Sequence, residues 1–132
     1  MTEFERSDVA NAMGIDNRIP SEEIRNNLNA LADNVLQPLR DEWGKAMPVN
    51  SGYRCPALNK AVGGVYNSQH MKGEAADIRT SLPYDLASLA VNLELPFDQL
   101  GVSNNFIHIS HKRGGGNRQQ VFYYKAYKGH RL

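Results

Sequence analysis

The sequence lacks several features that define other classes of protein. Its single cysteine, Cys55, cannot form a disulfide within the chain, so nothing requires an oxidising compartment. No apolar run approaches the roughly 20 residues of a membrane-spanning helix. The chain starts with Glu3, Glu5, Arg6 and Asp8 in place of a basic segment followed by an apolar one. We therefore expect no signal peptide and no membrane partner.

Acidic residues are absent from the last quarter of the chain. Residues 1–98 contain all 14 acidic residues and nine of the 15 basic ones, whereas residues 99–132 contain six basic residues and no acid. A basic end can bind nucleic acid or an anionic cell-wall polymer. The formal net charge is only +1, and no aromatic–basic motif of a known type is present. We therefore expect a solvated basic face and no nucleic-acid partner.

The rest of the composition is typical of one globular domain. The chain has 132 residues, 41% hydrophobic and 22% charged, which is enough to bury a core without disulfides. Helical periodicity follows the N-cap residue Ser21 as far as Gly44, with Pro38 inside the pattern, and returns over residues 81–93. A helical turn is predicted at residues 56–62, and extended segments at residues 47–53, 75–78, 97–102, 106–110 and 121–124. We expect a monomeric α+β domain over residues 1–132, with helices on a small antiparallel sheet and residues 1–20 as an extension packed on it.

One block of the sequence, residues 68–77, carries the clearest chemistry. His70 and Asp77 are separated by a glycine and small residues, which fits a loop that leads into a strand. His108 lies between two isoleucines on a predicted strand, so it faces the opposite side of the sheet from both. Two imidazoles and one carboxylate are a set of three zinc ligands that leaves a fourth position open for water. Spacing alone does not separate this set from hydrogen-bonded core histidines.

The same block reads Ser-x-His-x-x-Gly-x-Ala-x-Asp and resembles the metal-binding motif of the zinc D-Ala-D-Ala carboxypeptidase-like peptidases, the M15 family. Residues 49–54 resemble the family's Ser-Gly-Tyr-Arg turn. Residues 96–100 and 107–110 resemble the segments around its third ligand. The four pieces agree in order and spacing over about residues 20–125. The resemblance is closest to short single-domain members from phages and bacteria.

The resemblance implies a zinc site held by His70, Asp77 and His108, in a fold similar to that of the hedgehog signalling domain. It implies that Arg54 binds a substrate carboxylate or stabilises the developing negative charge, roles that suit a planar guanidinium. It also places Ser68 and Gln69 at the pocket edge, where they would bind substrate. Capping of the loop is the alternative role for these two side chains.

The carboxylate that moves a proton in this family has no match here. Family members carry it in the segment before the third ligand, where this chain has a serine and two asparagines at positions 103–105. Serine and asparagine bind water but cannot relay its proton at neutral pH. Glu74 and His111 are weaker candidates, and we expect both to be exposed.

Asp98 is the remaining acid near this segment, and the hairpin register decides its direction. If Leu100 pairs with His108, Asp98 shares the face of His108. If Gly101 pairs with His108, Asp98 points to the opposite face. We name Asp98 as a catalytic candidate beside Arg54, with a structural role as the alternative.

Three functions compete at this stage. The first is a zinc metallopeptidase that acts on peptidoglycan stem peptides, as a D-Ala-D-Ala carboxypeptidase or an L-Ala-D-Glu endopeptidase. Such an enzyme would be made in the cytoplasm and reach the cell wall after holin-type release, as a phage endolysin, or from a phage particle. The second is a zinc-containing cell-wall binding module that has lost catalysis. The third is a binder of nucleic acid or anionic polymer through the basic end.

Overall fold

The computed structural model describes residues 3–132 as one α+β domain built on a five-stranded sheet. The strand order is β1-β2-β4-β3-β5. The strands are β1 (Val49–Ser51), β2 (Ala75–Arg79), β3 (Gln99–Val102), β4 (Phe106–Ser110) and β5 (Gln120–Tyr123). The predicted fold class is confirmed, with one difference in the sheet. Strands β1 to β4 pair antiparallel, but β5 runs parallel to β3, so the sheet is mixed.

Strand alternation separates two faces of this sheet. Ile78, Leu100 and Ile107 are fully buried and belong to the hydrophobic core. Their neighbours Asp77 and His108 point the other way, toward a cavity. The sheet therefore has one apolar face, which builds the core, and one polar face, which is free to build a site.

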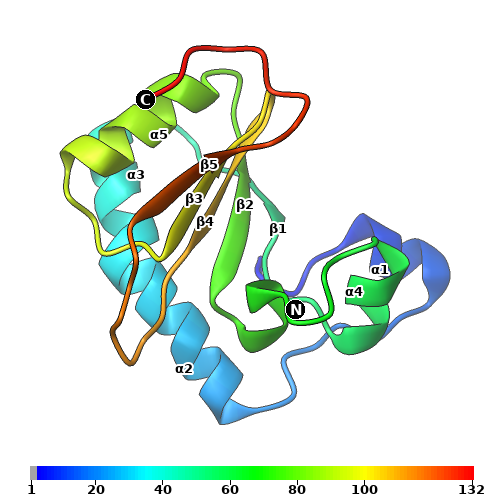
Figure 1. Ribbon diagram of the computed structural model, residues 1–132. Coiled ribbons are helices and arrows are strands. Elements are labelled where there is room, and N and C mark those ends of the chain that lie inside the picture. Colours follow the sequence, from blue (N-terminus) through cyan, green and yellow to red (C-terminus); the bar gives the residue numbers. More distant parts are fainter. Residues whose placement is uncertain (1–2) are drawn as a thin grey trace.

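Helices cover the apolar face (Figure 1). They are α2 (Glu22–Leu31), the π-helical segment η1 (Ala32–Leu36), α3 (Gln37–Trp43) and α5 (Pro83–Asn92). Ser21 caps α2 through a hydrogen bond from the Ile24 N–H, as predicted. The regular α-helix ends at Leu31, and the chain passes through η1 before α3 begins. Pro38 accounts for this interruption, because its ring nitrogen cannot donate the helical hydrogen bond.

Three short helices lie outside this layer, and α1 and α4 lie together beside the polar face of the sheet (Figure 1). They are α1 (Asp8–Met13), α4 (Pro56–Ala61) and the 3₁₀ helix η2 (Gln69–Lys72). The α4 turn was predicted, whereas α1 and η2 were not. Six- and four-residue helices have too few turns to show a periodic apolar stripe. Within residues 3–132, no helix has the length and apolar character needed to cross a membrane.

Residues 3–20 are tied to the rest of the domain by the buried side chain of Asn17. Its amide donates hydrogen bonds to the carbonyl oxygens of Glu5 and Tyr53, both at 2.9 Å. Its Oδ1 accepts from the Cys55 N–H at 2.7 Å. The Tyr53 N–H in turn donates to the Phe4 carbonyl. The N-terminal segment therefore supports the turn that carries Arg54.

Candidate metal and active site

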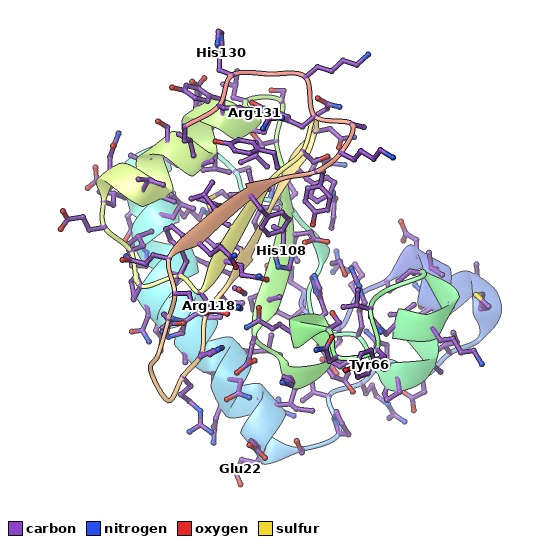
Figure 2. The ribbon with its side chains drawn as sticks, in the orientation of Figure 1. Glu22, Tyr66, His108, Arg118, His130 and Arg131 are labelled. Carbon is purple, nitrogen blue, oxygen red and sulfur yellow. The ribbon has the colours of Figure 1, made fainter. Side chains whose placement is uncertain are left out.

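A cavity of about 750 Å³ opens on the polar face of the sheet. Figure 2 shows His108 on this side, with Arg118 near the start of β5 and Tyr66 beyond, in the loop after α4. Strand residues form the floor, and the loops around α4, η2 and residues 111–119 contribute the walls. Lining side chains include Arg54, Gln69, His70, Lys72, Glu74, Asp77, Gln99, His108, Lys112, Arg118, Phe122 and Tyr124.

The structure brings together the three predicted metal ligands. Asp77 on β2 lies directly opposite His108 on β4 in the strand register. Asp77 Oδ1 is 2.9 Å from His108 Nδ1 and 3.3 Å from His70 Nε2. One ligand atom from each residue lies within 4.8 Å of those of the other two. Three donors this close, at the bottom of a cavity, have the chemistry and spacing of a divalent metal site.

The surroundings of His70 fit this role. Its Nδ1 lies 2.7 Å from the Gly52 carbonyl oxygen, which can only accept a hydrogen bond, so the ring proton sits on Nδ1. The other ring nitrogen, Nε2, faces Asp77 and is the one that a neutral ring would offer to a metal, while the Gly52 carbonyl fixes the ring through Nδ1. Burial raises the pKa of Asp77, but hydrogen bonds with His108 and His70 outweigh it and hold the pKa below its usual range. The carboxylate is therefore ionised and ready to bind a cation.

Arg54 reaches the same carboxylate. Its Nη2 is 3.5 Å from Asp77 Oδ2, its Nε donates to Ser51 Oγ at 3.0 Å, and its Nη1 donates to Asn59 Oδ1 at 3.3 Å. The side chain is 15% exposed, so the guanidinium is oriented but still meets the cavity. Asn59 was not singled out from the sequence, since nothing local marks it as a support for Arg54.

Ser68 and Gln69 line the cavity as predicted, but each side chain also makes a protein contact. Ser68 Oγ accepts from the His70 N–H and caps η2, which is the alternative role. Gln69 Nε2 donates to Asp98 Oδ2 at 3.1 Å. Their predicted contact with substrate stays a prediction.

Asp98 is fully buried beneath the cavity wall. Its carboxylate accepts from Arg118 Nε at 2.9 Å and from Arg118 Nη2 at 2.8 Å, and Lys112 Nζ is 3.8 Å away. The hydrogen bonds from Arg118 lower the pKa of Asp98 to about 2. A carboxylate this acidic and this enclosed is a poor proton acceptor at neutral pH. The contacts therefore favour the structural role, and the catalytic role of Asp98 stays a prediction.

The hairpin register explains only part of this arrangement. Gly101 pairs with His108, so regular alternation would turn Asp98 to the opposite face. That expectation is wrong because the ladder is irregular at this point. Asp98 N–H donates to the Ser110 carbonyl, and the next N–H, that of Gln99, donates to Ser110 Oγ. Two successive residues thus face one, as in a β-bulge, and the Asp98 carboxylate reaches Gln69 and Arg118 at the cavity wall.

The last strand supplies an aromatic wall. Phe122 and Tyr124 line the cavity, whereas Tyr123 packs against the core and stacks on Tyr127 at 5.6 Å. Burial, together with the nearby Asp77 charge, raises the pKa of Tyr124 to about 12, so its hydroxyl stays protonated. Tyr123 and Tyr124 thus serve different roles, because successive residues of an extended segment face opposite sides.

Two expectations about weaker acid–base candidates are wrong. His111 is buried, with Nδ1 2.6 Å from the Pro96 carbonyl and Nε2 3.2 Å from Asn34 Nδ2. Glu74 is half-buried and lines the cavity. Among residues 3–132 it is the one cavity-lining carboxylate outside the three-ligand cluster. Asn104 and Asn105, in the hairpin turn, are exposed and do not line the cavity.

This combination of an α+β sheet and a two-histidine, one-aspartate cluster in an open cavity is typical of a metal-dependent hydrolase. A family model described as Peptidase M15 matches residues 1–110. The chain therefore belongs to the Peptidase M15 family. The match begins before the resembling segments and ends before the loop at 111–119 and β5. No match was found among curated proteins.

Proposed function

We propose that the chain is a zinc peptidase that cleaves stem peptides of peptidoglycan, as a carboxypeptidase of the D-Ala-D-Ala type or an endopeptidase of the L-Ala-D-Glu type. The observation that carries the proposal is the convergence of His70, Asp77 and His108 at the bottom of an open cavity, beside Arg54. Membership of a peptidase family supports the reaction class. A phage endolysin or a hydrolase carried on a phage particle is the setting we propose for it.

The three clustered residues would hold the zinc ion. When bound, zinc supplies Lewis acidity, which polarises a scissile carbonyl and makes water more acidic. Arg54 is already oriented by Ser51 and Asn59, so it can bind a substrate carboxylate without first losing much conformational freedom. It can equally stabilise the negative charge that develops on the carbonyl oxygen.

Hydrolysis also needs a group that moves a proton. Water adds its oxygen to the carbonyl carbon, the C–N bond breaks, and one proton must reach the leaving amine. We assign this transfer to Glu74, because Asp98 is enclosed by Arg118 while Glu74 lines the cavity. Glu74 takes a proton from the attacking water and returns it to the amine nitrogen.

A second candidate is a zinc-containing binding module for the cell wall. The specific observation in its favour is the amide-bearing hairpin turn, where Asn104 and Asn105 replace the expected acid. Under this alternative the cluster still holds metal and the cavity still holds a peptide, but Glu74 transfers no proton.

Digestion of purified peptidoglycan tests the proposal. Zinc-loaded protein is incubated with walls of several types, and the products are identified by mass spectrometry beside Asp77→Ala. New stem-peptide fragments that disappear in the variant establish the peptidase and its bond. Retention of zinc and binding to the walls without any fragment would leave the binding module as the function.

A further inference from the structure

The wall of the cavity carries a second arginine, Arg118, whose position is fixed by the buried Asp98 carboxylate. Arg118 donates to both oxygens of Asp98 through Nε and Nη2, and its backbone N–H donates to Oδ1 at 3.0 Å. Asp98 is fully buried, while the Arg118 side chain is 51% exposed and lines the cavity. The buried Asp98 carboxylate therefore orients the Arg118 guanidinium at the surface of the cavity.

Arg118 retains donors for a ligand. A guanidinium has five N–H donors, and Asp98 takes only the Nε–H and one of those on Nη2. In the part of the chain that the structure describes, no protein acceptor is recorded for Nη1. Lys112 and Lys72 line the same cavity, so it is lined by these two cations as well as Arg118. An anionic ligand is what such a wall attracts.

The segment that carries Arg118 is built as a fixed wall. Asn117 hydrogen bonds with both the N–H and the carbonyl of Lys112. The next residue, Gln119, has a positive φ of 51° and is held there by bonds from its N–H to Phe97 and from Nε2 to Leu95. This segment lies outside the family match at residues 1–110.

We propose that Arg118, positioned by buried Asp98, binds a second carboxylate of the substrate, one other than the group that Arg54 meets. The inference rests on the proposed function, since the ligand is taken to be a stem peptide. Arg118 therefore favours substrates whose non-terminal carboxylates are free over substrates in which these carboxylates are replaced by carboxamides. Carboxamides cannot accept a charge-assisted pair of hydrogen bonds from a guanidinium.

The test uses two synthetic stem peptides that differ only in whether their non-terminal carboxylates are free or amidated. Wild-type protein, Arg118→Gln, Arg118→Lys and Arg113→Gln are compared, each loaded with zinc. Arg113 lies on the same loop but donates to Asn27 and does not line the cavity, so its variant is a matched control. Affinity is measured by titration calorimetry, turnover as kcat/KM, and folding by thermal unfolding.

We expect wild-type protein and Arg113→Gln to prefer the free-carboxylate peptide by about 10- to 100-fold, the range for a lost charge-assisted hydrogen bond. Arg118→Gln should lose the preference and Arg118→Lys should keep part of it. Equal affinity and kcat/KM of the wild-type protein for both peptides would overturn the assignment. An Arg118→Gln variant that is destabilised and loses the same affinity for both peptides would overturn it too. If neither peptide is cleaved, the proposed function fails, and the calorimetric preference still decides the role of Arg118.

Discussion

At the scale of single residues, Asp77 is the group on which the site depends. One carboxylate meets His70, His108 and Arg54, and its position opposite His108 is set by the pairing of β2 with β4. The sheet therefore sets the positions of Asp77 and His108, and η2 brings His70 beside them before any metal binds. Such a site needs little reorganisation, so metal binding should appear as added stability of the folded state.

Zinc should raise the thermal stability of the wild-type protein, and a chelator should reverse the effect. At a free zinc concentration about 1,000 times the Kd, the gain is about 4 kcal/mol, a rise in Tm on the order of 10 °C. Asp77→Ala should show no such rise, whereas His130→Ala should behave like wild type, because His130 lies beside Tyr84 and not in the cavity. Differential scanning calorimetry with and without zinc makes the measurement. A full response in Asp77→Ala would contradict the assigned ligand set.

Glu74→Gln separates catalysis from metal binding. The amide keeps the size of the side chain but cannot carry a proton, so kcat should fall by about 100- to 10,000-fold. Zinc affinity should remain that of wild type, because Glu74 is outside the ligand cluster. Peptide hydrolysis and zinc titration give the two readouts, and Glu23→Gln on the exposed start of α2 is the control. Unchanged kcat in Glu74→Gln would assign the proton transfer to another group.

At the scale of elements, the N-terminal segment supports the turn before α4. Asn17 makes three hydrogen bonds from a fully buried position, two to carbonyls and one from the Cys55 N–H. Arg54 lies between the two residues of this turn that Asn17 contacts. Asn17 therefore joins residues 3–20 to the turn that carries Arg54, whereas the assignment of residues 1–20 as an extension of the domain stays a prediction.

Asn17→Ala should lower the free energy of unfolding by about 2–4 kcal/mol, because it removes the three hydrogen bonds that the buried Asn17 side chain makes with the backbone of Glu5, Tyr53 and Cys55. It should also raise KM, since Arg54 loses its fixed orientation. Denaturant unfolding and steady-state kinetics measure the two effects. Asn26→Ala, on the exposed face of α2, is the control and should leave both unchanged. A stable Asn17→Ala with wild-type KM would show that the segment does not support the site.

The β3–β5 pair holds the aromatic wall through a close approach at Gly101. A Cβ added at Gly101 would meet the Phe122 ring at 2.4 Å, so Gly101→Ala must displace that ring. We expect a loss of about 1–3 kcal/mol in stability from overpacking and a rise in KM. Gly114→Ala is the matched control, because its Cβ would meet nothing within 4 Å. Denaturant titrations of both variants compare them, and equal stability would mean that Phe122 is not held over β3.

Local patterns predicted the helices and strands well but not how distant segments meet. The Ser21 cap, the strand at 106–110 and the direction of His108 on it follow from caps and alternation. The parallel docking of β5 does not, because no local pattern says which strand a later one joins. No local pattern predicts the burial of Asp98 either, since it depends on an irregular ladder and on an arginine 20 residues further along the chain.

At the scale of the whole molecule, the uneven distribution of charge along the chain is resolved in the fold. Lys112 and Arg118, from the acid-free end, return to the cavity and meet Asp98, the last acid in the sequence. Part of the basic end therefore builds the site and is not a separate binding face. The buried Asp98 carboxylate connects the acidic and basic parts of the chain. Because its protonation depends on pH, the stability of the domain depends on pH as well.

Asp98→Asn tests this ion pair between Asp98 and Arg118. Arg118 lowers the pKa of Asp98 to about 2 in the folded protein, against an ordinary value of 3.8. A lowered pKa means that the carboxylate adds stability above about pH 5, and that this stability is lost as the pH falls through 4 toward 2. The free energy of unfolding of the wild-type protein should therefore exceed that of Asp98→Asn by about 1–3 kcal/mol at pH 7. This range allows for solvent screening at the half-exposed Arg118. The difference should shrink steadily in acid.

Urea unfolding of both proteins between pH 2 and pH 7 measures the difference. Asp16→Asn is the matched control, because Arg18 also lowers the pKa of Asp16 to about 2, but both side chains are exposed. An exposed pair contributes little, so its removal should have a much smaller effect at every pH. A difference between wild type and Asp98→Asn that stays constant down to pH 2 would show that Asp98 acts through packing and not through its charge. In that case Arg118 would hold its place at the cavity without an ionic anchor, and substrate selection should survive in Asp98→Asn.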